Sequence, residues 1–166
     1  MALFDMFNPT KRPIGGTPVL PDAEMRARLM AFNRPTSPWH LIDGSAEGVD
    51  FIAEWKITDA EWRETFSKAK VNSVFRITLK FDPLKAEVHG VDYEYSVEWS
   101  AGVPNLKPVA SGNQRQQATT STAAAYHFTE ELRPYQVFNY RFHTEEIKRP
   151  IQNAITTSGW TYKSKM

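Results

Sequence analysis

The chain has 166 residues, 41% hydrophobic and 23% charged, and its 20 basic and 19 acidic residues give a formal net charge of +1. This length fits one domain that buries roughly 70% of its unfolded surface. The balanced charge disfavours nucleic acid and acidic membranes as partners, and the absence of cysteine excludes disulfides and thiol catalysis. Because no apolar run reaches the ~20 residues of a membrane span and no secretory signal is recognisable, we expect a cytoplasmic protein.

The first 21 residues combine an apolar segment with an arm. Residues 8–21 hold four prolines and two adjacent glycines, which predicts a linker without regular structure. A free helix of seven residues is marginal in water, so we expect residues 1–7 to dock on their own domain, a neighbouring subunit or a membrane surface. Lys11 and Arg12 supply too little charge for stable membrane binding, which favours a protein partner or self-association. The side chains expected to bind the partner are Leu3, Phe4, Met6 and Phe7.

The next elements are a helix and two strands. Residues 22–33 have a helical apolar stripe formed by Met25, Leu29 and Phe32. Strands are expected at residues 39–43 and 49–56, joined through two glycines.

A second helix is predicted over residues 59–69. Thr58 and Glu61 match a capping box, in which the two side chains bond the first free amides of the helix. Its apolar stripe consists of Trp62, Phe66 and Ala69, and Glu64 and Lys68 have the spacing of an exposed ion pair.

A hairpin with alternating side chains occupies the centre of the chain. Residues 74–81 form its first strand, with Phe75, Ile77, Leu79 and Phe81 on the inner face. The return strand includes residues 91–100, VDYEYSVEWS, in which apolar and acidic residues alternate. If Asp82 and Lys85 close the turn, an extra residue at Gly90 is needed to keep the inner residues opposite one another.

This register makes the acidic face of the return strand a solvated sheet surface. With the bulge, Ile77 lies opposite Val91 and Arg76 opposite Asp92, so that opposite charges pair across the hairpin. Glu94 and Glu98 have no partner in this scheme. Together with His89 they are the candidates for acid–base catalysis, although a carboxylate on an open face keeps an ordinary pKa.

The last third of the chain predicts more strands and a helix. We expect a hairpin of residues 104–111 and 121–128, a strand at 135–142, and an edge strand at 160–162. A short helix begins with Pro150 in its first turn and ends at Gly159. The polar loop at residues 111–122 has no pattern that indicates its role.

Other chemistry finds little support in the sequence. The four histidines, His40, His89, His127 and His143, lack the spacing of a zinc site, so we expect no metal. Neither G-x-S-x-G nor a glycine-rich phosphate loop occurs, and we expect no cofactor. Tyr93, Tyr95 and Trp99 share a face suited to stacking RNA bases, but that face also has core composition.

The runs AEWKITDAEWRETFSKA, FRITLKFD and VDYEYSVEWSAGVP resemble a family of small uncharacterised bacterial cytoplasmic proteins. The later stretches FTEEL, FNYRF and PIQNAITTSGWT share the resemblance, which spans residues 49–162. It implies a bacterial origin and an intact single domain, and it carries no activity or site residue.

These features together predict an α+β protein with an N-terminal arm, residues 1–21, and a single domain, residues 22–166. The domain is expected to have a curved, predominantly antiparallel sheet of six to eight strands packed with two or three helices. We expect a non-enzymatic binding or assembly module that docks through its N-terminal segment. The alternatives are a hydrolase-type enzyme using the acidic residues and a histidine, or a binder of hydrophobic ligands in a cavity of the curved sheet.

Overall fold

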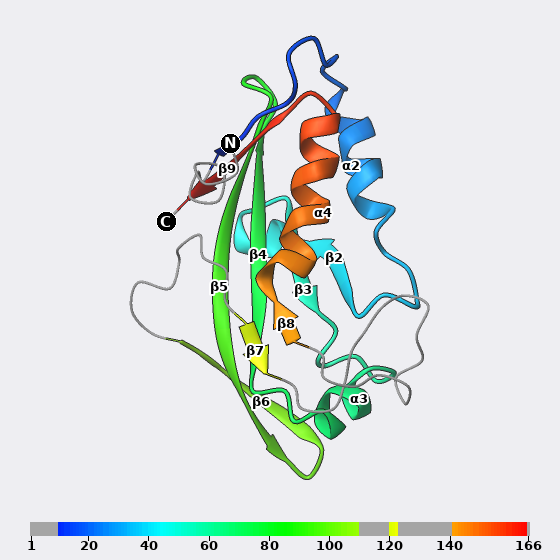
Figure 1. The fold of residues 1–166 in the computed structure, drawn as a ribbon, viewed down its shortest axis with the longest axis vertical. Helices are drawn as coiled ribbons and strands as arrows, with labels where there is room; N and C mark the ends of the chain where they lie inside the picture. Colours follow the sequence, from blue (N-terminus) through cyan, green and yellow to red (C-terminus); the bar gives the residue numbers. More distant parts are fainter. Residues whose placement is uncertain (1–9, 110–119, 123–140, 166) are drawn as a thin grey trace.

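The computed structural model describes residues 10–109, 120–122 and 141–165. They form a seven-stranded, mostly antiparallel sheet with three helices, which confirms the α+β prediction (Figure 1). The strands of this sheet are β1 (Thr10–Lys11), β2 (Trp39–Asp43), β3 (Phe51–Trp55), β4 (Ser73–Asp82), β5 (Glu87–Ser100), β6 (Val103–Pro108) and β9 (Thr161–Lys165). The helices are α2 (Asp22–Met30), α3 (Arg63–Lys68) and α4 (Thr144–Thr157), and a 3-10 turn, η1, spans Ser45–Glu47. A separate ladder joins β7 (Thr120–Thr122) to β8 (Arg141–His143).

The strand order is β1-β9-β5-β4-β3-β2, with β6 also paired to β5, and the sheet stays open. Every neighbouring pair is antiparallel except β5 and β9, which run parallel. The C-terminal strand was expected at an edge, but β9 lies between β1 and β5. Its parallel direction follows from α4, which carries the chain back along the sheet, since parallel pairing needs such a crossover.

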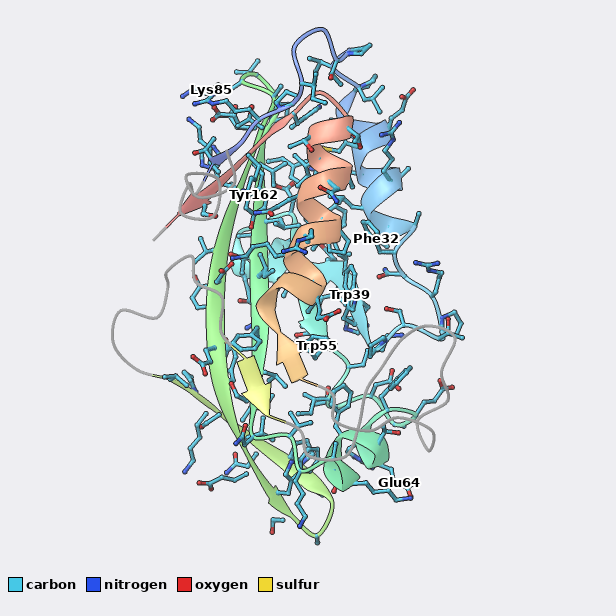
Figure 2. All side chains as sticks on the ribbon, in the orientation of Figure 1. Phe32, Trp39, Trp55, Glu64, Lys85 and Tyr162 are labelled. Atoms are coloured by element: carbon cyan, nitrogen blue, oxygen red, sulfur yellow. The ribbon has the colours of Figure 1, made fainter. Side chains whose placement is uncertain are left out.

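One face of the sheet, called here the core face, is covered by α2 and α4 (Figure 1). Helix α4 contributes a fully buried isoleucine stripe at spacing i, i+4, i+8: Ile147, Ile151 and Ile155. The predicted stripe of α2 is confirmed at Met25 and Leu29, both 0% exposed. Phe32, just beyond α2, packs on Trp39 with ring centroids 5.4 Å apart (Figure 2). Burying each such side chain contributes roughly 1.5–3 kcal/mol before ordering costs, so these helices hold the sheet in shape.

Two helix starts differ from the sequence prediction. Helix α3 begins at Arg63, and no capping box forms, because the Asp59 carboxylate accepts the Glu61 amide in a preceding turn at 2.8 Å. Helix α4 begins at Thr144, well before Pro150, which lies inside it. The stripe of Trp62, Phe66 and Ala69 is buried as predicted.

The predicted register of the central hairpin is wrong. Asp82 pairs with Glu87, and the β4–β5 ladder continues without a bulge to Ser73 and Ser96. The Asp82 carbonyl accepts the Lys85 amide as assumed, but the left-handed Ala86 follows before β5 begins at Glu87, which makes the turn wider. Ile77 therefore faces Asp92, which takes the core-face parity.

Gly90 serves close packing instead of a bulge. It lies opposite Leu79 on the core face, and the Tyr162 side chain of β9 lies against it. A Cβ at this position would collide with the Tyr162 hydroxyl, so only glycine fits beneath the ring.

The pairing predicted for the last third of the chain is also corrected. Strand β6 pairs with β5, and β7 pairs with β8, so residues 104–108 and 120–122 do not form one hairpin. The predicted stretches 123–128 and 135–140 lie outside the described residues, as does most of the polar loop.

Candidate functional site

The three acid–base candidates do not converge. His89 and Glu94 have opposite parity on β5 and point to opposite faces of the sheet. His89 Nε2 lies 3.1 Å from Glu87 Oε1, whereas Glu94 Oε2 accepts a hydrogen bond from Ser73 at 2.9 Å. Glu98 lies about 13 Å further along the strand and is exposed, 3.9 Å from Lys107. Because acid–base partners must lie within hydrogen-bond reach, these side chains form no common site in this structure.

A buried ion pair joins β5 to α4. Lys148 Nζ donates to Asp92 Oδ2, and the two side chains are 0% and 7% exposed. The interpretation of the acidic parity as a solvated surface is therefore wrong at Asp92. A charge removed from water needs a close partner, and here each group supplies it for the other.

The pair positions α4 but offers little chemistry of its own. Lys148 follows Ile147 on the buried face of the helix, and Asp92 faces Ile77 in the middle of the hairpin. A lysine with no exposed area does not reach a dissolved substrate. The sequence contains one weak signal for the pair, since Lys148 directly follows the first residue of an apolar helical stripe and Asp92 lies in a strand that supplies core residues.

A second charged group lies where β4, β5 and β9 meet. Donor atoms of Asp82, Glu87 and His89 lie within 4.8 Å of one another, and a divalent cation accepts such carboxylate and imidazole ligands. Lys163 of β9 donates to Glu87 at 3.0 Å. This hydrogen bond is the largest cause that lowers the pKa of Glu87, and the bond with His89 adds to it. Because the Lys163 ammonium already neutralises the Glu87 carboxylate, an ion-pair network explains the cluster of Asp82, Glu87 and His89 without a bound metal.

The outer face, opposite the core face, has its own charged network. Arg76 of β4 donates to Glu47 of η1 at 2.6 Å and to the Tyr95 hydroxyl at 3.0 Å. Glu54 lies across from Arg76 at 3.6 Å, and His40 Nε2 lies 3.3 Å from Glu54. The network attaches η1 to the sheet and links four neighbouring strands, β2, β3, β4 and β5.

The described part of the N-terminal arm is bound to its own domain near both of its ends. Thr10 and Lys11 form β1 and pair with Lys163 and Tyr162 of β9. Further on, Leu20 donates its amide to Ser158 O and accepts the Trp160 indole N–H, both at 2.9 Å. The prediction that this stretch has no regular structure is therefore wrong at Thr10 and Lys11, whereas no helix or strand is present over residues 12–21. The partner-binding candidates Leu3, Phe4, Met6 and Phe7 lie outside the described residues, immediately before β1.

Comparisons with known proteins add no identity. No family model, curated protein or solved structure matches the chain. The resemblance to a bacterial family therefore stays a prediction. Among the described residues, no helix has both the length and the hydropathy needed to cross a membrane.

Proposed function

We propose that this protein is a non-enzymatic binding or assembly module that docks through its N-terminal segment. The observation that carries the proposal is the position of β1. In the sequence, the segment of residues 1–7 ends three positions before Thr10 of β1. Among the described strands, β1 is the outermost on its side of the sheet. A partner that binds this segment therefore acts directly at a sheet edge.

The composition of the segment supplies the second support. Four large apolar side chains lie within seven residues, and each contributes roughly 1.5–3 kcal/mol when it is buried. A second copy of the chain is the partner we favour, because the balanced charge of +1 does not oppose self-association. Bacterial origin and a cytoplasmic location belong to this proposal as well.

The test is self-association of a chain that lacks residues 1–9, measured by sedimentation velocity over a range of concentrations. A longer deletion, through residue 20, would also remove β1 and the Leu20 contacts with Trp160. The shorter deletion keeps these contacts, so we expect an unchanged melting temperature in dilute solution together with weaker association.

A matched pair of variants separates the segment from general surface hydrophobicity. The first replaces Leu3, Phe4 and Phe7 with serine. The second replaces Ile14 and Val19, which are 85% and 60% exposed in the bound part of the arm, with serine. Association lost only in the first variant supports the proposal. A parent that is monomeric, with a first variant that is clearly less stable, places the segment in its own core and refutes it.

The alternatives have less support. A hydrolase using Glu94, Glu98 and His89 lacks a shared site among the described residues. A hydrophobic-ligand binder needs an open space on the core face, where α2 and α4 lie (Figure 1). Both stay predictions.

A further inference from the structure

Among the described strands, β2 is the outermost on the side of the sheet away from β1. The Lys56 amide bonds Pro38 O at 2.8 Å, and the Gly44 amide bonds Asp50 O at 3.1 Å. Because antiparallel strands exchange hydrogen bonds at every second residue, His40 and Ile42 point their backbone groups toward β3. The amides and carbonyls of Trp39 and Leu41 therefore point away from the sheet, in the direction from which a further strand would pair with β2.

Two side chains occupy these outward groups. The Asn33 side-chain amide accepts the Leu41 N–H at 2.7 Å and donates to the Leu41 carbonyl at 2.8 Å. Ser37 Oγ donates to the Trp39 carbonyl at 3.0 Å and accepts the Trp39 N–H at 3.4 Å. A neighbouring strand would make the same bonds, so Asn33 and Ser37 imitate one.

We propose that Asn33 and Ser37 form an edge block that prevents a second copy of the chain from pairing with β2. An exposed strand edge is a template for another chain, and proteins commonly close such edges. Here the block comes from the loop between α2 and β2, and it competes directly with intermolecular hydrogen bonds.

The register of β2 identifies a second copy as the partner that is excluded. An antiparallel pair centred on Leu41 would place Trp39 opposite Asp43 and His40 opposite Ile42 of the other copy. No like charges face each other in this register, and Ile42, which is 36% exposed, would gain a neighbour. Among the described residues, the side-chain bonds of Asn33 and Ser37 oppose it.

Strand β6 shows that a second edge of the same sheet is closed by different means. The Val109 amide bonds Glu94 O at 3.0 Å, which places Pro104, Leu106 and Pro108 at the outward positions. Proline has no amide hydrogen, so two of these three outward donors are absent. Both edges offer few free backbone groups to an added strand. At β2 side chains occupy these groups, whereas at β6 prolines lack the amide hydrogen.

Site-specific cross-linking tests the block, because the chain has no cysteine of its own. In the paired dimer, the two Ile42 residues are diagonal neighbours about 7–8 Å apart. The experiment introduces Ile42→Cys into the parent and into Asn33→Ala/Ser37→Ala, and applies a short bismaleimide of about that span. We expect about tenfold more cross-linked dimer in the open-edge variant, the factor that one net hydrogen bond is worth.

Controls make the result specific. Leu84→Cys, at a position 100% exposed in the β4–β5 turn, detects non-specific association. Asn153→Ala removes an exposed asparagine from α4 and is expected to leave the Ile42→Cys yield unchanged. Association through the N-terminal segment raises the yield equally with and without the block, so its presence or absence does not alter the comparison.

Two results would overturn the proposal. They are equal Ile42→Cys yields with and without the block in folded chains, and an equal rise at Leu84→Cys. If circular dichroism shows that the double variant is unfolded, the single variant Asn33→Asp is used to test the block instead. Its carboxylate still accepts the Leu41 amide but leaves the Leu41 carbonyl without a donor, and an unchanged yield in this variant refutes the block.

Discussion

Removing one member of the ion pair between Asp92 and Lys148 should destabilise the fold severely. The two side chains are 7% and 0% exposed, so water neither screens the pair nor solvates the group left behind. Breaking a buried pair typically costs about 3–5 kcal/mol. Domains have total stabilities of roughly 5–15 kcal/mol, so Asp92→Asn alone should remove a large part of the margin.

Urea unfolding followed by tryptophan fluorescence measures this effect. The matched control is Glu64→Gln, which breaks the pair of Glu64 and Lys68, 76% and 61% exposed, and should cost about 0.5 kcal/mol or less. The double replacement Asp92→Leu/Lys148→Met removes both charges and should restore most of the loss, because apolar pairs of similar size commonly replace buried ion pairs without cost. If Asp92→Asn unfolds within about 1 kcal/mol of the parent, Asp92 is solvated and the assignment of the core face is wrong.

Three further predictions follow from single contacts. Trp62→Ala should cost about 3–5 kcal/mol in the same assay, because the side chain is 6% exposed and packs on Phe66; a loss below about 1 kcal/mol would place it outside the core. Gly90→Ala should cost roughly 1–3 kcal/mol through overpacking against Tyr162, and adding Tyr162→Phe should recover part of the loss; an alanine tolerated without loss would contradict this packing. Lys163→Met should raise the pKa of Glu87 toward its ordinary value in an NMR titration. The lowered pKa stabilises the fold above the ordinary glutamate pKa, and this contribution is lost as the pH falls through the lowered value, so an unchanged pKa in the variant would disprove the Lys163 bond.

Local patterns predicted the elements that depend on neighbouring residues. Strand β2 occupies residues 39–43 as expected, and β4 extends the predicted strand by one residue at each end. The stripe that begins at Trp62 is buried, because helical spacing and apolar character pointed to the same face. These elements were predictable because their signals come from residues close together in the sequence.

The register of the central hairpin was not predictable in the same way. A turn closed by Asp82 and Lys85 and a turn closed by Asp82 and Glu87 both satisfy local turn chemistry, yet they place β5 in different registers. Charge complementarity favoured the turn closed by Asp82 and Lys85, because its register, with a bulge at Gly90, paired Arg76 with Asp92. The structure instead matches Arg76 with Glu47 and Glu54, which come from an earlier part of the chain.

The choice between these registers was decided by α4, which lies 56 residues from Asp92 at its Lys148 contact. The helix presents an isoleucine stripe with one buried lysine beside it, and a carboxylate on the facing strand makes that lysine tolerable. Asp92 is consequently a core residue only because Lys148 is one too. Neither residue alone indicates burial, since an isolated aspartate in an alternating strand normally faces water. Testing buried charges as pairs, across every helix that could cover a strand, would have found this contact in the sequence.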